Sequence, residues 1–182
     1  MIKVSNFGLS EVLLLEYPLI EDNRGRSVRA FSKRELSAIG ITADFVEEIH
    51  YFPKMKNTLY GIHFQNRPKP QTKLIHCTKE KMLDFAVDLR KGSPEYKKWA
   101  CVELSPENRK QVYIPAGFGH AALTLEDNTH IVFMIDEYFD SSLSRAVKFN
   151  DIDLNIGFNV TDPILSKQDK DAPFLKESDC NL

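Results

Sequence analysis

LIHCTKEKMLDFAVDL, residues 74–89, contains two apolar runs separated by a charged tetrapeptide. Leu74–Cys77 and Met82–Leu89 are short and rich in apolar, β-branched and aromatic residues, which is typical of strands, whereas Thr78–Lys81 is typical of a turn. The same pattern recurs from residue 45 to about 150. The other predicted strands are Phe45–Tyr51, Ala100–Leu104, Gln111–Ile114, Ala121–Leu125 and His130–Tyr138, with further turns at residues 90–94 and 126–128. This spacing indicates an all-β antiparallel barrel or sandwich, and we expect a small β-barrel.

The segment before this region adds a strand, a turn and one clear helix. Val12–Tyr17 is a predicted strand and Glu21–Gly25 a predicted turn. Ser32 and Glu35 have the spacing of a capping box, in which each side chain binds a backbone N–H of the other residue. Gly40 follows about two turns later as a stop, so a short helix is expected between these residues.

Length and composition predict a single domain. The chain has 182 residues, of which 42% are hydrophobic, and this is enough for one buried core but short for two. No repeat, low-complexity tract or linker interrupts it, so we expect one domain spanning residues 1–182. The polar segment after Pro163 is predicted to form a short helix or a loop across the barrel.

Charge and cysteine content exclude several functional classes. A net charge of -2 and a pI of about 6.2 leave no global basic field for nucleic acid or a membrane, although a local Arg or Lys cluster could still bind one anion. Cys77, Cys101 and Cys180 lack Cys-x-x-Cys spacing and cannot all pair. No apolar stretch approaches the roughly 20 residues of a membrane span. We therefore expect a soluble, cytoplasmic protein without nucleic-acid or membrane partners.

Two histidines and a lysine lie in short, strand-like segments of this predicted barrel. His63 is the centre of Gly-Ile-His-Phe-Gln, Lys73 follows ten residues later, and His120 ends Ile-Pro-Ala-Gly-Phe-Gly-His. Imidazole can accept a proton near neutral pH, and an ammonium group can stabilise an enolate oxygen. This combination predicts acid–base chemistry on a carbonyl substrate.

The histidine pattern argues against a metal site. Barrels of this kind often bind a metal through His-x-His, but His63 is followed by Phe64 and Gln65. The remaining histidines are isolated among predicted strand residues and are expected to be structural; they are His50, His76 and His130. We expect no metal ion and no cofactor.

Several blocks, in order and at compatible spacing between about residues 18 and 175, resemble the dTDP-4-dehydrorhamnose 3,5-epimerases. The matching blocks are Asp22–Gly25, Gly61–Gln65, Gln71–Leu74, Asp84–Pro94, Glu103–Ser105 with Asn108, Tyr113–Phe118 with His120, and Leu165–Ser166 with Asp169 and Pro173. The resemblance implies a metal-free, cupin-type antiparallel β-barrel (jelly roll) with a few short helices. It also implies a nucleotide-linked 4-keto-6-deoxy sugar as substrate.

The resemblance further implies roles for individual residues. His63 would remove the proton next to the 4-keto group, and Asp169 would bind its other nitrogen. Lys73 would stabilise the enolate oxygen, with His120 as a further polar contact, and Arg24 would bind the diphosphate.

Each role has a structural alternative. A lone histidine such as His63 usually has a structural role, Lys73 could be a solvated surface residue, and Asp169 could cap a turn. Arg24 before a glycine also fits an ordinary turn. Asp84, in a predicted strand, could support the site or belong to a polar face.

The chain departs from the family pattern at the acid. The family has a tyrosine in the predicted strand 130–138 that acts opposite the histidine, but this chain has Phe133 there, which cannot donate a proton. Inversion needs proton removal from one face and delivery to the other, so the acid must be water, another side chain such as Tyr138, or absent.

Positions expected to contact the nucleotide also differ. Tyr60 replaces an arginine, Ser27 and Arg29 replace a phenylalanine and a glutamate, and Glu47 and Ile49 replace a glutamine and an asparagine. A buried site that hydrogen-bonds thymine strongly disfavours any change that leaves its polar groups without partners. Because so many of these positions differ, CDP or GDP is an alternative to dTDP as the nucleotide. The expected substrate-binding residues are Arg24, Arg29, Glu47, Tyr60, His120 and Tyr138.

The leading hypothesis is an epimerase acting at carbon 3, carbon 5 or both of a nucleotide-linked 4-keto-6-deoxyhexose. The resemblance places it in deoxysugar biosynthesis for a surface polysaccharide and implies a homodimer whose N-terminal strands complete each other's sites. Two alternatives remain at this stage. One is a 3,4-ketoisomerase, which shares the first proton removal, and the other is a non-catalytic sugar-binding cupin that lost turnover with Phe133.

Overall fold

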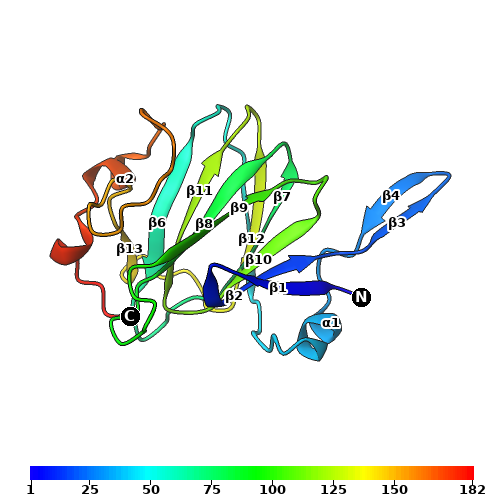
Figure 1. Ribbon diagram of the computed structural model, residues 1–182, viewed down its shortest axis with the longest axis horizontal. Helices are drawn as coiled ribbons and strands as arrows, with labels where there is room; N and C mark the ends of the chain where they lie inside the picture. Colours follow the sequence, from blue (N-terminus) through cyan, green and yellow to red (C-terminus); the bar gives the residue numbers. More distant parts are fainter.

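The computed structural model describes residues 1–182 as two antiparallel sheets packed face to face (Figure 1). The six-stranded sheet has the order β1 (Lys3–Phe7), β2 (Leu9–Glu16), β10 (Lys110–Ile114), β7 (Lys73–Lys79), β12 (His130–Ile135) and β5 (Glu47–Tyr51). The five-stranded sheet has the order β13 (Ser144–Ala146), β6 (Leu59–Gln65), β11 (Phe118–Thr124), β8 (Met82–Asp88) and β9 (Trp99–Leu104). The prediction of an all-β, cupin-type jelly-roll barrel with a few short helices is confirmed.

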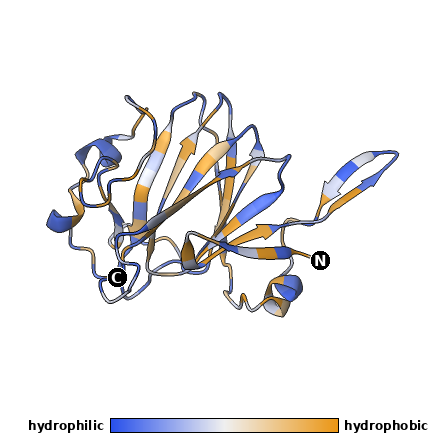
Figure 2. Ribbon diagram, in the orientation of Figure 1, coloured by the Kyte–Doolittle hydropathy of each residue, from blue (hydrophilic) through white to orange (hydrophobic).

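The two runs of residues 74–89 become strands of different sheets. β7 pairs with β10 and β12, whereas β8 pairs with β11 and β9. The charged turn between them therefore crosses from one sheet to the other. Each strand turns one face toward the space between the sheets, and the apolar residues on these faces form the core, which includes Ile75, Ala86 and Ile131. Figure 2 shows the corresponding orange segments along the strands.

Several strand predictions need correction. β12 ends at Ile135, so the prediction of a strand reaching Tyr138 is too long. β1 and β13 were not predicted, because they are short or mostly exposed. The predicted turn at residues 21–25 is the tip of an exposed hairpin formed by β3 (Leu19–Asp22) and β4 (Gly25–Val28). This hairpin projects away from the barrel (Figure 1).

The predicted helix forms as α1 (Lys33–Ala38), but its capping box is only half complete. Ser32 Oγ accepts a hydrogen bond from the Glu35 backbone N–H at 3.3 Å. The Glu35 carboxylate instead accepts a hydrogen bond from Arg29 at 3.0 Å. Gly40 follows the helix with φ of 88°, a conformation that glycine adopts without steric cost.

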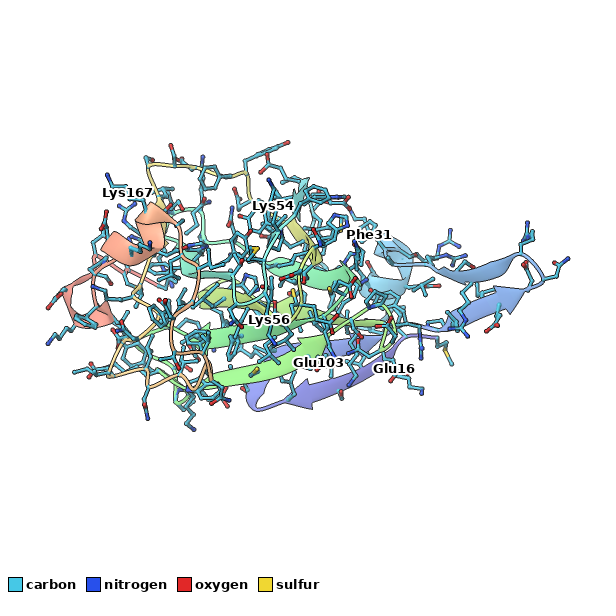
Figure 3. The ribbon with its side chains drawn as sticks, turned by 90° about the horizontal axis from the view of Figure 1, so that it is seen from above. Glu16, Phe31, Lys54, Lys56, Glu103 and Lys167 are labelled. Carbon is cyan, nitrogen blue, oxygen red and sulfur yellow. The ribbon has the colours of Figure 1, made fainter.

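The C-terminal segment forms a short helix, α2 (Lys167–Asp171), and a 3₁₀ turn, η1 (Leu175–Glu177). α2 lies beside β6, at the end of the molecule opposite the β3–β4 hairpin, where Lys167 marks it in Figure 3. Side chains fill the space between the sheets in that view. None of the helices has the length and apolar character needed to cross a membrane.

Candidate active site

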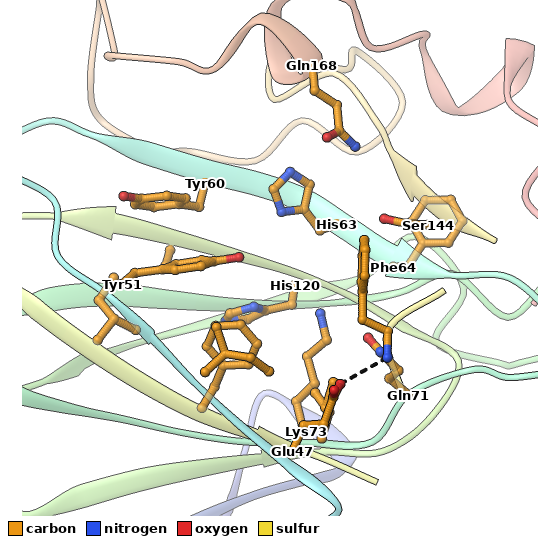
Figure 4. A pocket seen from close by; sticks show the side chains of 16 residues that line it. Glu47, Tyr51, Tyr60, His63, Phe64, Gln71, Lys73, His120, Ser144 and Gln168 are labelled. Atoms are coloured by element: carbon orange, nitrogen blue, oxygen red, sulfur yellow. Dashed lines mark hydrogen bonds between the residues drawn. The ribbon is translucent and has the colours of Figure 1, made fainter. Parts of the chain in front are cut away.

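A cavity of about 430 Å³ opens between the two sheets, and both sheets supply its walls. β5, β7 and β12 of the six-stranded sheet form one wall, while β6 and β11 of the five-stranded sheet form the other. Its polar or aromatic lining residues are Glu47, Tyr51, Tyr60, His63, Phe64, Gln71, Lys73, His120, Phe133, Phe139, Ser144 and Gln168 (Figure 4). Aliphatic side chains complete the lining, so polar groups that converge here lie in partly apolar surroundings.

His63, on β6, is paired with a carboxylate from the far end of the chain. Its Nε2 lies 2.5 Å from Asp169 Oδ1, and Asp169 is only 2% exposed. Ser166 holds that carboxylate, because its hydroxyl donates to Asp169 Oδ2 at 2.8 Å and accepts the Asp169 backbone N–H at 3.1 Å. A carboxylate accepts the Nε2–H proton, so the neutral imidazole has its lone pair on Nδ1. Asp169 therefore orients the ring and fixes the tautomer of a base.

A glycine two residues earlier brings His63 beside His120. β6 pairs with β11 so that His63 is opposite His120, and the register shifts just after this pair. Gly61 has φ of 104°, and a Cβ atom there would overlap the carbonyl oxygen of His120. The residue must therefore be glycine for the two strands to approach this closely.

Lys73, the first residue of β7, presents a buried ammonium group to the same cavity. The residue is 7% exposed, and its ammonium group forms neither an ion pair nor a hydrogen bond with the protein. In Figure 4 the Lys73 side chain lies beside His120 and points toward His63. Burial lowers the pKa of Lys73 from 10.5 to about 8, and the negative charge of Asp84 opposes this shift. An unpaired cation in this position is available to a developing oxyanion.

Asp84 belongs to the interior of the site and not to a polar outer face. Its Oδ2 lies 2.7 Å from His120 Nε2, the residue is 1% exposed, and its other oxygen has no hydrogen-bond partner. His120 is therefore oriented by a second histidine–carboxylate pair. The negative charge of Asp84 also helps to keep Lys73 protonated, because it opposes the lowering of the lysine pKa by burial.

The structure brings some of the predicted substrate-binding residues together and leaves others outside the cavity. Tyr60 and Glu47 line it, and Glu47 Oε2 accepts the Phe139 backbone N–H at 3.0 Å. Arg24, Arg29 and Tyr138 do not line the cavity of their own chain, and their roles in substrate binding stay predictions. Arg24 binds Asp22 at 2.6 Å on the projecting hairpin, Arg29 binds Glu35 near α1, and Tyr138 is 62% exposed beyond the end of β12.

Tyr51 lines the cavity but was missed by the sequence reasoning. In β5, exposure alternates strictly, and Glu47, Ile49 and Tyr51 share the inward face. Glu47 was predicted to contact substrate, so the two-residue period of a strand would have placed Tyr51 in the same wall. Phe133, on the neighbouring strand, lines the cavity next to it.

The arrangement can remove a proton from a carbon acid. A histidine with a free ring nitrogen faces the cavity from one sheet, and an unpaired ammonium group reaches into it from the other. Proton removal next to a carbonyl generates an enolate, whose oxygen the ammonium group would stabilise. No group of three or more His, Cys, Asp or Glu side chains is placed to hold a metal ion.

Comparison with known proteins gives a consistent picture along the whole chain. The family model described as dTDP-4-dehydrorhamnose 3,5-epimerase matches residues 6–177. A dTDP-4-dehydrorhamnose 3,5-epimerase from Shigella flexneri is 33% identical over 172 residues, which are 94% of each chain.

Two solved structures show the same fold. The crystal structure of dTDP-4-dehydrorhamnose 3,5-epimerase from Bacillus anthracis, with TDP and pyrophosphate bound, is 37% identical with a TM-score of 0.93, covering 96% of this chain and 99% of that one. The dTDP-6-deoxy-D-glucose-3,5-epimerase of Legionella pneumophila, in complex with dTDP-4-keto-L-rhamnose, is 29% identical with a TM-score of 0.92, covering 98% and 95%.

Proposed function

The chain belongs to the dTDP-4-dehydrorhamnose 3,5-epimerase family and, on that premise, we propose that it epimerises a dTDP-linked 4-keto-6-deoxyhexose with His63, Lys73 and Asp169 as its catalytic machinery. It is an isomerase of nucleotide-linked 4-keto-6-deoxy sugars. The whole chain, residues 1–182, would act as one catalytic domain. One observation carries the assignment of residues: a carboxylate-bound histidine and an unpaired buried ammonium group face a single cavity.

His63 acts as the base. Its Nδ1 takes a proton from a carbon adjacent to the C4 carbonyl, and the C–H electron pair moves into the bond between that carbon and C4. Asp169 stabilises the imidazolium that results, because its charge lies 2.5 Å from Nε2. The buried position of Asp169 keeps water from competing for this contact.

Lys73 and His120 act on the oxygen. The C4 carbonyl oxygen becomes negatively charged as the proton leaves, and the Lys73 ammonium group neutralises that charge inside a partly apolar cavity. His120, held by Asp84, is placed to contact the same oxygen or a neighbouring hydroxyl. Removal of a single group of this kind typically costs 10²- to 10³-fold in rate.

The nucleotide contacts rest on the remaining lining residues and on the relatives. The structures from Bacillus anthracis and Legionella pneumophila contain TDP and a dTDP-sugar, which supports dTDP as the nucleotide here. Tyr60 and Glu47 add an aromatic face and a carboxylate to the lining of the cavity.

Hydrogen exchange in heavy water tests both the reaction and the nucleotide. The protein is incubated in D₂O with dTDP-, CDP- and GDP-linked 4-keto-6-deoxyglucose, and NMR follows deuterium and configuration at carbons 3 and 5. We expect deuterium and inversion with the dTDP sugar and loss of both in His63→Asn. No deuterium entering from any of the three sugars would refute the proposed function, and turnover of the CDP or GDP sugar alone would refute the nucleotide.

A homodimer would give the β3–β4 hairpin a role. The hairpin projects from the barrel with Leu19, Ile20 and Val28 exposed, and Arg24 at its tip lies outside the cavity lining of its own chain (Figure 1). We propose that it reaches the cavity of a partner subunit, where Arg24 binds the diphosphate. Light scattering should then give twice the chain mass, and Arg24→Ala should raise KM with little change in kcat. A monomeric, fully active protein would contradict this.

The proposed location rests on the cysteines, and the proposed metabolic context rests on the family. Three cysteines that form no disulfide are consistent with a reducing compartment, which supports a cytoplasmic location. We place the product in deoxysugar biosynthesis for a surface polysaccharide. Cell fractionation and the sugar composition of a deletion strain would test these two statements.

A further inference from the structure

Inversion at a carbon needs a proton delivered to the face opposite the base. His63 occupies the wall formed by the five-stranded sheet, so a side chain that delivers this proton would come from the six-stranded sheet. Phe133 faces the cavity there but has no exchangeable proton. Lys73, on the same wall, is engaged by the enolate oxygen in the proposed function. His63 can remove a proton, but neither Phe133 nor Lys73 can return one to the opposite face of the sugar carbon.

Tyr51 occupies the required position. It lies on β5 of the six-stranded sheet and lines the cavity together with His63. In Figure 4 its hydroxyl points into the space between His63 and Lys73. That hydroxyl forms no hydrogen bond with another protein group, so it is free to meet a substrate.

The ring of Tyr51 is held on two sides. It stacks on Tyr60 with ring centroids 4.7 Å apart and an angle of 20° between the planes. The Phe133 ring forms an edge-to-face contact with it, with ring centroids 5.1 Å apart and an angle of 71° between the planes. These contacts restrict both side-chain torsions of the tyrosine, so the hydroxyl is fixed relative to the cavity. Phe133 thus supports a phenol that comes from the adjacent strand.

The surroundings keep this phenol protonated at neutral pH. Burial raises the pKa of Tyr51 above its ordinary value of 10.0, and the negative charge of Asp169 raises it further. A group that remains protonated can donate whenever the enolate forms. The other tyrosines do not fit the role, because the Tyr60 hydroxyl points away from His63 in Figure 4 and Tyr138 lies outside the cavity.

Building on the proposed function, we propose that Tyr51 is the acid that delivers a proton to the enolate on the face opposite His63. His63 Nδ1 takes the original proton, and the C–H electron pair forms the enolate. The enolate carbon then takes the proton of the Tyr51 hydroxyl, the carbonyl at C4 is restored, and the tyrosine becomes a phenolate. Solvent returns a proton to the phenolate and removes one from the imidazolium, so the cycle closes without net gain or loss of protons.

Tyr51→Phe separates proton removal from inversion. The variant loses only the hydroxyl, while His63 can still remove a proton and return deuterium to the same face. Incubation with dTDP-4-keto-6-deoxyglucose in D₂O should show inversion reduced about 100-fold or more and exchange without inversion reduced less than about tenfold. Tyr113→Phe, which removes a phenol outside the cavity, is the matched control and should leave both rates unchanged.

The outcomes distinguish this proposal from the function on which it rests. Absence of exchange in the unmodified protein would refute the function itself. Normal exchange and inversion in Tyr51→Phe would refute the tyrosine assignment alone, and so would equal loss of both rates, which indicates a structural role. The unmodified protein offers an independent readout: the ratio of inversion to exchange should stay constant up to pH 10 and fall above it, whereas a fall between pH 6 and 8 would overturn the assignment.

Discussion

Replacing Lys73 with methionine should stabilise the fold while abolishing the reaction. The ammonium group is buried without a partner, and its burial lowers its pKa from 10.5 to about 8. Each pH unit by which a pKa moves corresponds to about 1.4 kcal/mol, so the charged lysine costs roughly 3 kcal/mol in the folded state. Methionine has a similar length and no charge, and it removes this cost. For a chain of this size the gain corresponds to a rise in Tm of about 6–12 °C.

The pH dependence identifies the origin of the gain. Between about pH 8 and 10.5 the unfolded chain retains a proton on Lys73 that the folded chain has released, so the stability of the unmodified protein rises with pH in this interval. The penalty is therefore fully present below pH 8 and is lost as the pH approaches 10.5. Urea denaturation of both proteins at pH 7 and pH 10 measures it. The exposed Lys54 provides the control variant, Lys54→Met, which should show no comparable gain.

Either of two stability results would show that the gain does not come from a buried charge on Lys73. If Lys73→Met is no more stable than the unmodified protein at pH 7, the lysine does not carry a desolvated charge. A stability gain of the same size at pH 7 and pH 10 would likewise attribute the effect to packing. Loss of turnover alone does not report on the cost of burying the charge, so stability and activity are measured on the same preparation.

Three further predictions concern neighbouring positions. Asp169→Asn should lower turnover on the order of 10²-fold or more, because an amide neither fixes the tautomer of His63 nor balances the positive charge of its imidazolium. The circular dichroism spectrum should remain unchanged, and a loss of turnover below threefold would contradict the prediction. Gly61→Ala should reduce the free energy of unfolding by about 1–3 kcal/mol, because the new Cβ atom sits on a left-handed backbone and overlaps the His120 carbonyl oxygen on β11. Urea denaturation measures this loss, and an unchanged midpoint would contradict it. Phe133→Tyr in the Tyr51→Phe background should restore at least about tenfold of the lost inversion, followed by NMR in D₂O, because the two rings touch; no recovery would show that a hydroxyl on β12 does not reach the carbon.

Local sequence patterns were enough to locate most strands of the barrel but not to assign them to sheets. Leu74–Cys77 and Met82–Leu89 are recognisable as strands from their own residues. Their partners are distant in the chain, and the short turn between them suggests a pairing that does not exist. The β3–β4 hairpin was missed because its residues are exposed on both faces and show no alternation.

The residues alone indicated acid–base chemistry at His63, Lys73 and His120, but the pairing of His63 with Asp169 came only from the family resemblance. His63 and Asp169 are 106 residues apart, and no local pattern joins them. Arg24 was assigned by the same resemblance and Tyr138 was suggested as a substitute for the missing tyrosine acid, yet a single chain does not bring either residue to the cavity. Tyr51 follows from the alternation of its strand, but its relation to His63 depends on how the two sheets face each other.

Because base and acid stand on opposite sheets, the thickness of the apolar layer between those sheets sets the gap that the sugar ring must bridge. Facing sheets lie about 10 Å apart, and core side chains outside the cavity, such as Ile75 and Ala86, help to maintain this spacing. Substitutions that loosen this layer should have little effect on proton removal, which depends on His63 on one sheet. They should slow proton delivery by Tyr51, which depends on the distance between the two sheets. Such variants would become hydrogen-exchange catalysts that invert slowly. The ratio of inversion to hydrogen exchange should therefore depend on the packing of the hydrophobic core as well as on the residues that line the cavity.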